Sequence, residues 1–80
     1  MQQYHIFHST SAKAFTEETV QPREYVGYVE AQSLDDAYAK SQNDENPWNY
    51  EPCRSTSVGD VIQSDDGFFM VKKTGFQELI

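Results

Sequence analysis

Alternating hydrophobic and polar residues predict two strands in the first part of the chain. The segment Gln3–His8 alternates between two sides, so a strand there points His5 and His8 to opposite faces. A second run, Glu24–Ala31, is dense in Val and Tyr, which favour strands. Gly27 in its middle predicts a bulge or a close contact with another element.

A short helix is predicted after the second strand. Ser33 has the character of an N-cap, and the next residues place apolar side chains at positions i, i+3 and i+4. Asp35 and Asp36 fall in the first turn, where carboxylates meet the positive end of the helix dipole. We expect the helix to end near 42–43. A weaker signal predicts one helical turn within 12–18.

The last third of the chain predicts a hairpin. Ser57–Asp60 has the composition of a turn, Asp60–Gln63 of one strand and Phe68–Lys73 of the next. Asp66–Gly67 between them is a strong hairpin signal, because Gly tolerates positive φ. A further break is expected at Gly75–Phe76.

These elements predict an α+β fold: an antiparallel sheet of about four strands (β-β-α-β-β) with one short helix packed on one face. Adjacent apolar residues in the last two strands place side chains on both faces of the sheet. The loop 43–52 holds two prolines but also Trp48. We therefore expect this loop to cover the second face, or the sheet to curl toward a small barrel.

Length and charge narrow the class of partner. The 80 residues suffice for one domain, 1–80, and the net charge is −7 from 13 acidic and 6 basic residues. Acidic chains are repelled by phosphate backbones and anionic bilayers, so direct nucleic-acid and membrane binding are not expected. A protein partner with a basic surface is favoured. The alternative is that the acidity serves solubility alone.

The remaining composition indicates a cytoplasmic protein. Cys53 is the single cysteine, which excludes an internal disulfide and suits a reducing compartment. The N-terminal residues lack the basic region and long apolar run of a signal peptide. No apolar stretch is long enough to span a bilayer.

No catalytic or metal-binding arrangement is predicted. His5 and His8 should diverge on a strand, which is poor geometry for one metal ion. Cys53 lacks the surroundings of a thiol nucleophile, and a small half-buried residue is the simpler interpretation. We expect neither enzyme activity nor a cofactor.

Two candidate recognition surfaces remain. The first combines acidic and aromatic residues around the helix and its exit loop: Asp35, Asp36, Asp44, Glu45, Trp48, Tyr50 and Glu51. Such residues suit a protein interface, although capping, solvation and coverage of the sheet are the structural alternatives. The second is Arg54, Ser55, Thr56 and Ser57, whose guanidinium and hydroxyls could cradle an anion. The alternative is a loop that satisfies itself, with Arg54 paired to a local carboxylate.

A segment reading Arg-Ser-Thr-Ser-Val-Gly-Asp-Val, residues 54–61, followed by Asp66–Gly67 and Gly75–Phe76, resembles a family of small, mostly uncharacterised proteins of bacteria and their phages. The resemblance runs from Tyr25 onward, over about two thirds of the chain. It implies an origin in a phage or mobile element and no particular chemistry.

Together these features lead to two functional hypotheses. The first is a non-enzymatic acidic protein-binding module, an inhibitor of the anti-CRISPR or anti-restriction type that occludes a basic surface of a host nucleic-acid-handling complex. The second is a small ligand-binding domain that holds an anion or nucleotide at residues 54–60. The second hypothesis predicts a pocket lined by Arg54 and Ser57 and a thermal shift with nucleotides. The first predicts no such pocket and carboxylates gathered on one face.

Overall fold

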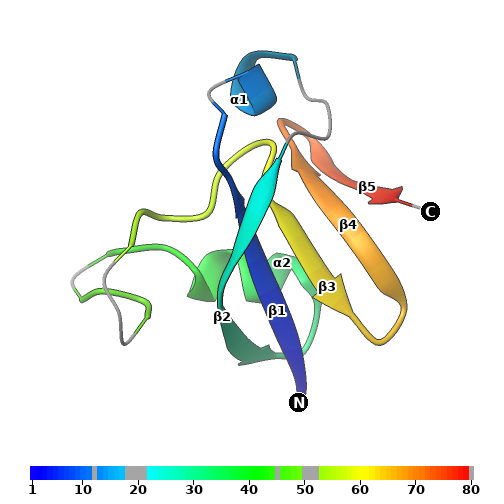
Figure 1. Cartoon of the computed structure of the whole chain (residues 1–80). Helices are drawn as coiled ribbons and strands as arrows, with labels where there is room; N and C mark the ends of the chain where they lie inside the picture. The colour runs from blue at the N-terminus through cyan, green and yellow to red at the C-terminus, as the bar shows by residue number, and fades with distance from the viewer. Residues whose placement is uncertain (12, 18–21, 45, 50–52, 80) are drawn as a thin grey trace.

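The computed structural model describes residues 1–11, 13–17, 22–44, 46–49 and 53–79. Its single sheet has the strand order β2-β1-β3-β4-β5, and every neighbouring pair is antiparallel (Figure 1). The elements in chain order are β1 (Gln2–Ser9), α1 (Lys13–Glu17), β2 (Arg23–Ala31), α2 (Leu34–Lys40), β3 (Val61–Ser64), β4 (Gly67–Lys72) and β5 (Gly75–Leu79).

The α+β class is confirmed, but the sheet has five strands and not about four. The additional strand is β5, at which the sequence indicated only a break. Gly75 has φ +99° and pairs with Lys72, so the chain reverses there and continues as a strand against β4. Its five residues show no clear hydrophobic alternation, because one apolar side chain falls on each face: Phe76 pairs with Val71 and Leu79 with Phe68.

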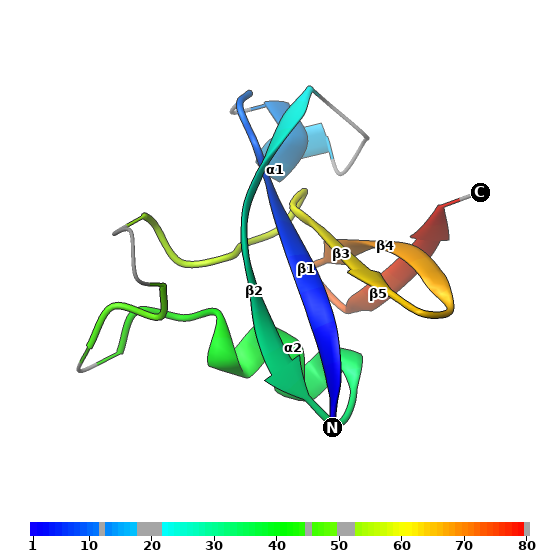
Figure 2. The ribbon, with the colours of Figure 1, turned by 60° about the horizontal axis from the view of Figure 1, so that its bottom comes forward.

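The hydrophobic core lies between α2 and one face of the sheet (Figure 2). Ser33 caps α2, since its hydroxyl accepts a hydrogen bond from the Asp36 backbone N–H, as the sequence predicts. Residues of alternate sheet positions form the core with the buried Ala37 of α2: Tyr4, Ile6, Val29, Ala31, Ile62 and Val71. On the opposite side of the sheet Val61 and Met70 are buried as well, so the one-sided burial of β1 does not extend to β3 and β4.

Gly27 lies both at a bulge and at a close contact with another element, the two alternatives that its position predicts. Ile6 pairs with Gly27 while Phe7 pairs with Tyr25, so Val26 is an extra residue and the strand bulges there. A Cβ at Gly27 would lie 2.8 Å from the side-chain nitrogen of Asn49. The glycine therefore admits a side chain from the loop after α2, whose amide nitrogen donates to the Val26 carbonyl.

The hairpin between β3 and β4 is confirmed, with its turn displaced by one residue. Val61 pairs with Met70 and Ser64 with Gly67, so Asp65 and Asp66 are the central turn residues. Gly67 opens β4 with φ +130°. The turn before β3 is confirmed as well, because the Asp60 N–H donates to the Ser57 carbonyl.

The described part of the loop after α2 places Trp48 on the helix side of the sheet, and not on the second face as one of our expectations had it. Trp48 packs against the core on the helix side, and its ring centroid lies 6.0 Å from that of His8. The described helices include none with the length and hydropathy needed to cross a bilayer.

Candidate functional site

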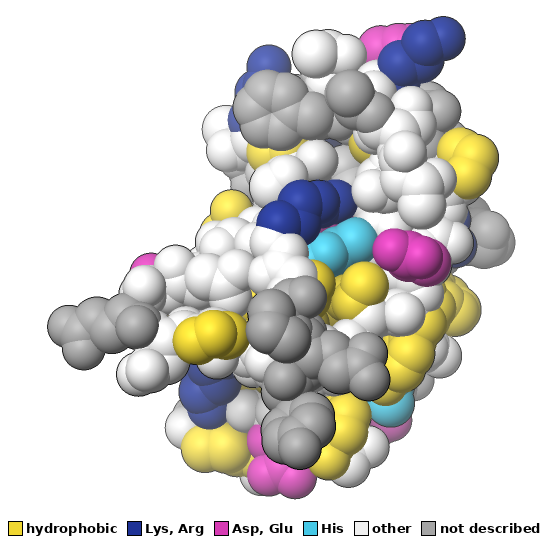
Figure 3. All heavy atoms as spheres, turned by 60° about the vertical axis from the view of Figure 1, so that its left-hand side comes forward, with side chains coloured by type: hydrophobic (Ala, Val, Ile, Leu, Met, Phe, Trp, Pro, Cys, Tyr) yellow, Lys and Arg dark blue, Asp and Glu magenta, His cyan; other side chains and the backbone are white. Residues whose placement is uncertain are grey.

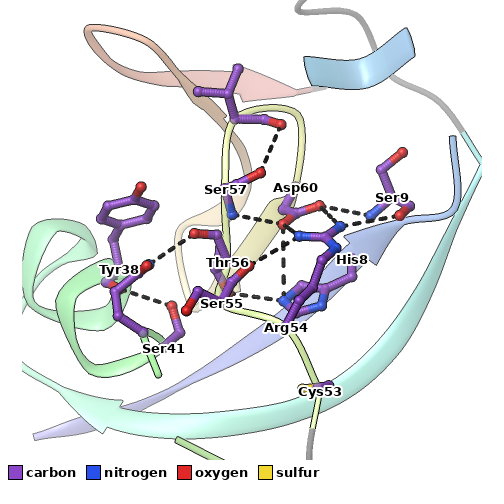
Figure 4. Close-up of polar contacts among 12 residues, drawn as sticks. His8, Ser9, Tyr38, Ser41, Cys53, Arg54, Ser55, Thr56, Ser57 and Asp60 are labelled. Carbon is purple, nitrogen blue, oxygen red and sulfur yellow. Dashed lines mark hydrogen bonds and ion pairs between the residues drawn. The ribbon is translucent and has the colours of Figure 1, made fainter. Parts of the chain in front are cut away.

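A buried carboxylate, that of Asp60, organises the polar end of the sheet (Figure 4). Asp60 directly precedes β3 and is 0% exposed. Its oxygens accept hydrogen bonds from the backbone N–H groups of Ser9 and Ser57, both at 2.8 Å. The carboxylate therefore joins the end of β1 to the turn that precedes β3.

Arg54 forms a bidentate pair with this carboxylate. Its Nη1 lies 2.6 Å from Oδ2 and its Nη2 lies 2.8 Å from Oδ1. The two nitrogens also donate to the carbonyls of Ser55 and Ser9, each at 3.1 Å. All four terminal N–H donors of the guanidinium thus have protein acceptors. The hydrogen bonds to Asp60 raise the pKa of Arg54.

His8 lies on the inner side of the pair. Its Nε2 is 3.0 Å from the Thr56 hydroxyl and 3.9 Å from Oδ2 of Asp60. Burial lowers the pKa of His8 below 6.5, and the attraction of Asp60 opposes this only in part. The ring is therefore neutral at pH 7.

The hydroxyl, imidazole and carboxylate do not form a nucleophilic triad. A triad engages both ring nitrogens, one toward the nucleophile and one toward the acid. Here both contacts are made by Nε2 of His8, and Thr56 is only 1% exposed. The arrangement orders the loop before β3 and offers no accessible nucleophile.

The outer side of the Arg54–Asp60 pair borders a pocket of about 330 Å³. Its lining is rich in hydroxyls: Ser9, Thr10, Ser11, Ala14, Arg54, Ser55, Ser57, Val58 and Asp60. Three of the four residues predicted to hold an anion line this pocket, and Thr56 lies behind it against His8. The charge of Arg54 is matched by Asp60, as the structural alternative for Arg54 expects.

The acidic residues near α2 have different environments. Asp36 accepts a hydrogen bond from the Gln32 N–H at 3.1 Å and lies 3.3 Å from Nζ of Lys40. The backbone hydrogen bond, followed by the contacts with Lys40, lowers the pKa of Asp36. Asp36 is thus a capping residue. Asp35 and Asp44 are exposed and free to meet a partner.

Trp48 is half-buried and held by the loop around it. Its indole N–H donates to the Arg54 carbonyl at 3.1 Å, and its backbone N–H donates to Oδ1 of Asn43 at 2.9 Å. Asn43 also donates to the Cys53 carbonyl and to the Ser55 hydroxyl. Asn43 therefore connects the two described parts of the loop by hydrogen bonds, a role that the sequence does not reveal.

A hollow of about 560 Å³ lies between α2 and this loop, lined by Ala39, Lys40, Gln42, Asp44, Asn46 and Trp48. It brings together Asp44 and Trp48, two members of the predicted acidic and aromatic surface. Glu45, Tyr50 and Glu51 lie outside the described residues. On the face shown in Figure 3, acidic side chains are scattered among basic and polar ones instead of forming one patch.

The carboxylate that pairs with Arg54 is not identifiable from the sequence. The composition of residues 57–60 predicts only a turn, whereas Asp60 contacts Arg54 six positions earlier in the chain. An arginine and an aspartate flanking a glycine turn is a weak signal for such a pair. Within the described residues, no three His, Cys, Asp or Glu side chains are placed to hold a metal ion.

Comparison of the chain with protein families, with curated proteins and with solved structures gave no match. The resemblance to small bacterial and phage proteins therefore stays a prediction.

Proposed function

We propose that this protein is a non-enzymatic binding module that docks on a basic surface of a protein partner. The observation that supports this function is the hollow between α2 and the following loop, where the exposed Asp44 lies beside the half-buried ring of Trp48. A carboxylate and an indole in one depression offer a salt link and an apolar anchor to an incoming Lys or Arg side chain.

Hydrogen bonds between the described parts of the loop favour binding. The side chain of Asn43 bonds to the backbone of Trp48 and Cys53, and the indole N–H of Trp48 donates to the Arg54 carbonyl. A surface that is already ordered loses less conformational entropy on association. The exposed carboxylates of Asp35 and Asp44 add long-range attraction, which mainly raises the association rate.

The specific form of the proposal is an inhibitor of the anti-CRISPR or anti-restriction type. Proteins that handle nucleic acids carry basic grooves for phosphate backbones, and a chain of net charge −7 is attracted to them. By occupying such a groove, the protein would exclude the nucleic acid without chemistry of its own.

Affinity capture from bacterial lysate, followed by mass spectrometry, tests this function with two matched variants. Asp35→Lys/Asp44→Lys removes the proposed surface, and Asp65→Lys/Asp66→Lys makes the same charge change in the exposed turn between β3 and β4. We expect nucleic-acid-handling proteins to be captured by the wild type and by the turn variant but not by the first variant. Equal capture by both variants contradicts the proposed surface.

The pocket beside Arg54 favours a second candidate, a small anion or nucleotide ligand. The pocket is lined by Arg54, Ser55 and Ser57, as that hypothesis requires. The pairing of Arg54 with Asp60 leaves little free positive charge there, so this candidate ranks lower. Thermal melts with inorganic phosphate and with ATP test it, and a melting temperature unchanged by either ligand removes it.

A further inference from the structure

The sheet face opposite α2 carries a continuous row of rings. In Figure 1, α2 lies behind the sheet, so this view looks onto that face. We call it the aromatic face, and its rings come from three strands: His5, Phe7, Tyr25, Tyr28 and Phe68. Tyr25 and Tyr28 are 53% and 50% exposed, the largest exposed rings among the described residues.

The rings of the aromatic face hold one another in place. The ring centroids of Phe7 and Tyr25 are 5.3 Å apart in an edge-on arrangement, and those of Phe7 and Phe68 are 6.1 Å apart. The Tyr25 hydroxyl lies 3.1 Å from Nδ1 of His5. These contacts fix exposed side chains, which lowers the entropy cost of burying them in an interface.

The strand register keeps most acidic side chains off this face. Glu24 pairs with His8 and Glu78 with Phe69, which places both on the helix side. Glu30 is the one described strand carboxylate on the aromatic side, together with the basic residues Arg23 and Lys72. A chain of net charge −7 thus presents a face close to neutrality.

From this distribution we propose that the aromatic face binds a second copy of the chain in a two-fold symmetric dimer. A two-fold axis pairs a patch with itself, so a patch rich in one charge repels and a neutral one does not. Tyrosine and histidine supply both donors and acceptors, which makes the face self-complementary. The tilted rings do not form the flat platform on which nucleic-acid bases stack.

The size of the face sets the strength of this dimer. Only part of this face is open, because Val61 and Met70 on the same side are each 1% exposed and so already covered. The whole side of the sheet, five strands at about 4.8 Å spacing and the eight residues of β1 at about 3.3 Å rise, is on the order of 500 Å², so the dimer buries less than this per copy. A standard interface buries about 800 Å² per partner, so we expect a weak dimer with a dissociation constant on the order of 100 µM. In this dimer α2 and Trp48 face outward on both copies, so the proposed partner surface stays open.

Sedimentation equilibrium of the purified chain from about 10 to about 500 µM tests the dimer. We expect the mean mass to rise from 9.2 kDa toward twice that value. Tyr28→Glu should keep the monomer mass, because dimerisation would bury an unpaired carboxylate on each copy. Asn46→Glu adds the same charge on the helix side and should dimerise as the wild type does.

Two results would overturn the proposal: a wild-type mass that stays at 9.2 kDa over the whole range, or a Tyr28→Glu protein that dimerises equally well. A second variant, Tyr25→Ser/Tyr28→Ser, removes ring area without adding charge and should also stay monomeric. Thermal melts of all variants show that they are folded, which is expected because both tyrosines are about half exposed.

Discussion

The guanidinium of Arg54 donates two parallel hydrogen bonds to the carboxylate of Asp60, from Nη1 to Oδ2 at 2.6 Å and from Nη2 to Oδ1 at 2.8 Å. The acid is buried while the arginine side chain is 47% exposed. The carboxylate end of the pair is therefore shielded from solvent, and the guanidinium end is in contact with it. The buried carboxylate links the end of β1 to the turn before β3 by hydrogen bonds, and the exposed guanidinium borders the hydroxyl-lined pocket.

Replacing Asp60 by Ala should strongly destabilise the fold. The substitution leaves the N–H groups of Ser9 and Ser57 without acceptors, each at a cost of about 1–3 kcal/mol. Urea unfolding should show a loss of roughly 2–5 kcal/mol. Asp65→Ala, in an exposed turn, is the control and should stay within about 0.5 kcal/mol of the wild type. Equal midpoints for both variants would show that the buried carboxylate is dispensable.

His8 should make the fold less stable in mild acid. Its folded pKa lies below 6.5, so the unfolded chain binds the proton more readily as the pH falls. The free energy of unfolding should therefore decrease as the pH drops below 6.5 toward the folded pKa, and the His8 contribution is fully present above 6.5. Urea melts between pH 7.5 and pH 5 measure this, with His8→Gln as the variant in which the slope flattens. An unchanged slope in that variant would assign the effect to another group.

Two glycines with positive φ should differ in their tolerance of a side chain. A Cβ at Gly67 meets only the far end of Glu78 at 3.9 Å, so Gly67→Ala should cost only the backbone strain of about 1–2 kcal/mol. A Cβ at Gly59 would lie 2.5 Å from the Cβ of Ala14 and 2.7 Å from its backbone. Gly59→Ala should therefore lower the melting temperature considerably more than Gly67→Ala, and the reverse order would contradict the close packing of α1 on this turn.

Trp48→Ala should weaken both the fold and partner binding. The ring packs against the core but is only half-buried, so we expect a loss below the 3–5 kcal/mol of a fully buried ring, about 2 kcal/mol. A thermal melt beside a binding titration separates the two effects. If the variant melts far below the wild type while Asp35→Lys/Asp44→Lys leaves partner binding unchanged, the proposed surface is wrong.

Duplex DNA should not bind at physiological salt. The 13 acidic residues repel the phosphate backbone, and the six Lys and Arg residues do not offset them, which leaves a net charge of −7. A fluorescence-anisotropy titration with a labelled duplex measures this, and tight binding at that salt would overturn it.

Local patterns determined the elements of this fold. The alternation in 3–8, the Ser33 cap and the turn glycines each depend on a few neighbouring residues, and the structure reproduces the corresponding strands, helix and hairpins. β5 has weak periodicity, so the sequence predicts only a break at its start and no strand. Its pairing with β4 is set by the turn at Gly75 and not by a pattern of its own.

Tertiary structure alone decided what the polar and aromatic residues do. The sequence allows Arg54 either to bind an external anion or to form an internal ion pair. In the folded chain the Ser9 carbonyl and the Asp60 carboxylate lie close enough to accept its hydrogen bonds. Likewise, only the path of the loop placed Trp48 on the helix side of the sheet. The reason is physical: sequence periodicity reports which side of an element is apolar, whereas hydrogen bonds between distant segments depend on how the elements pack together.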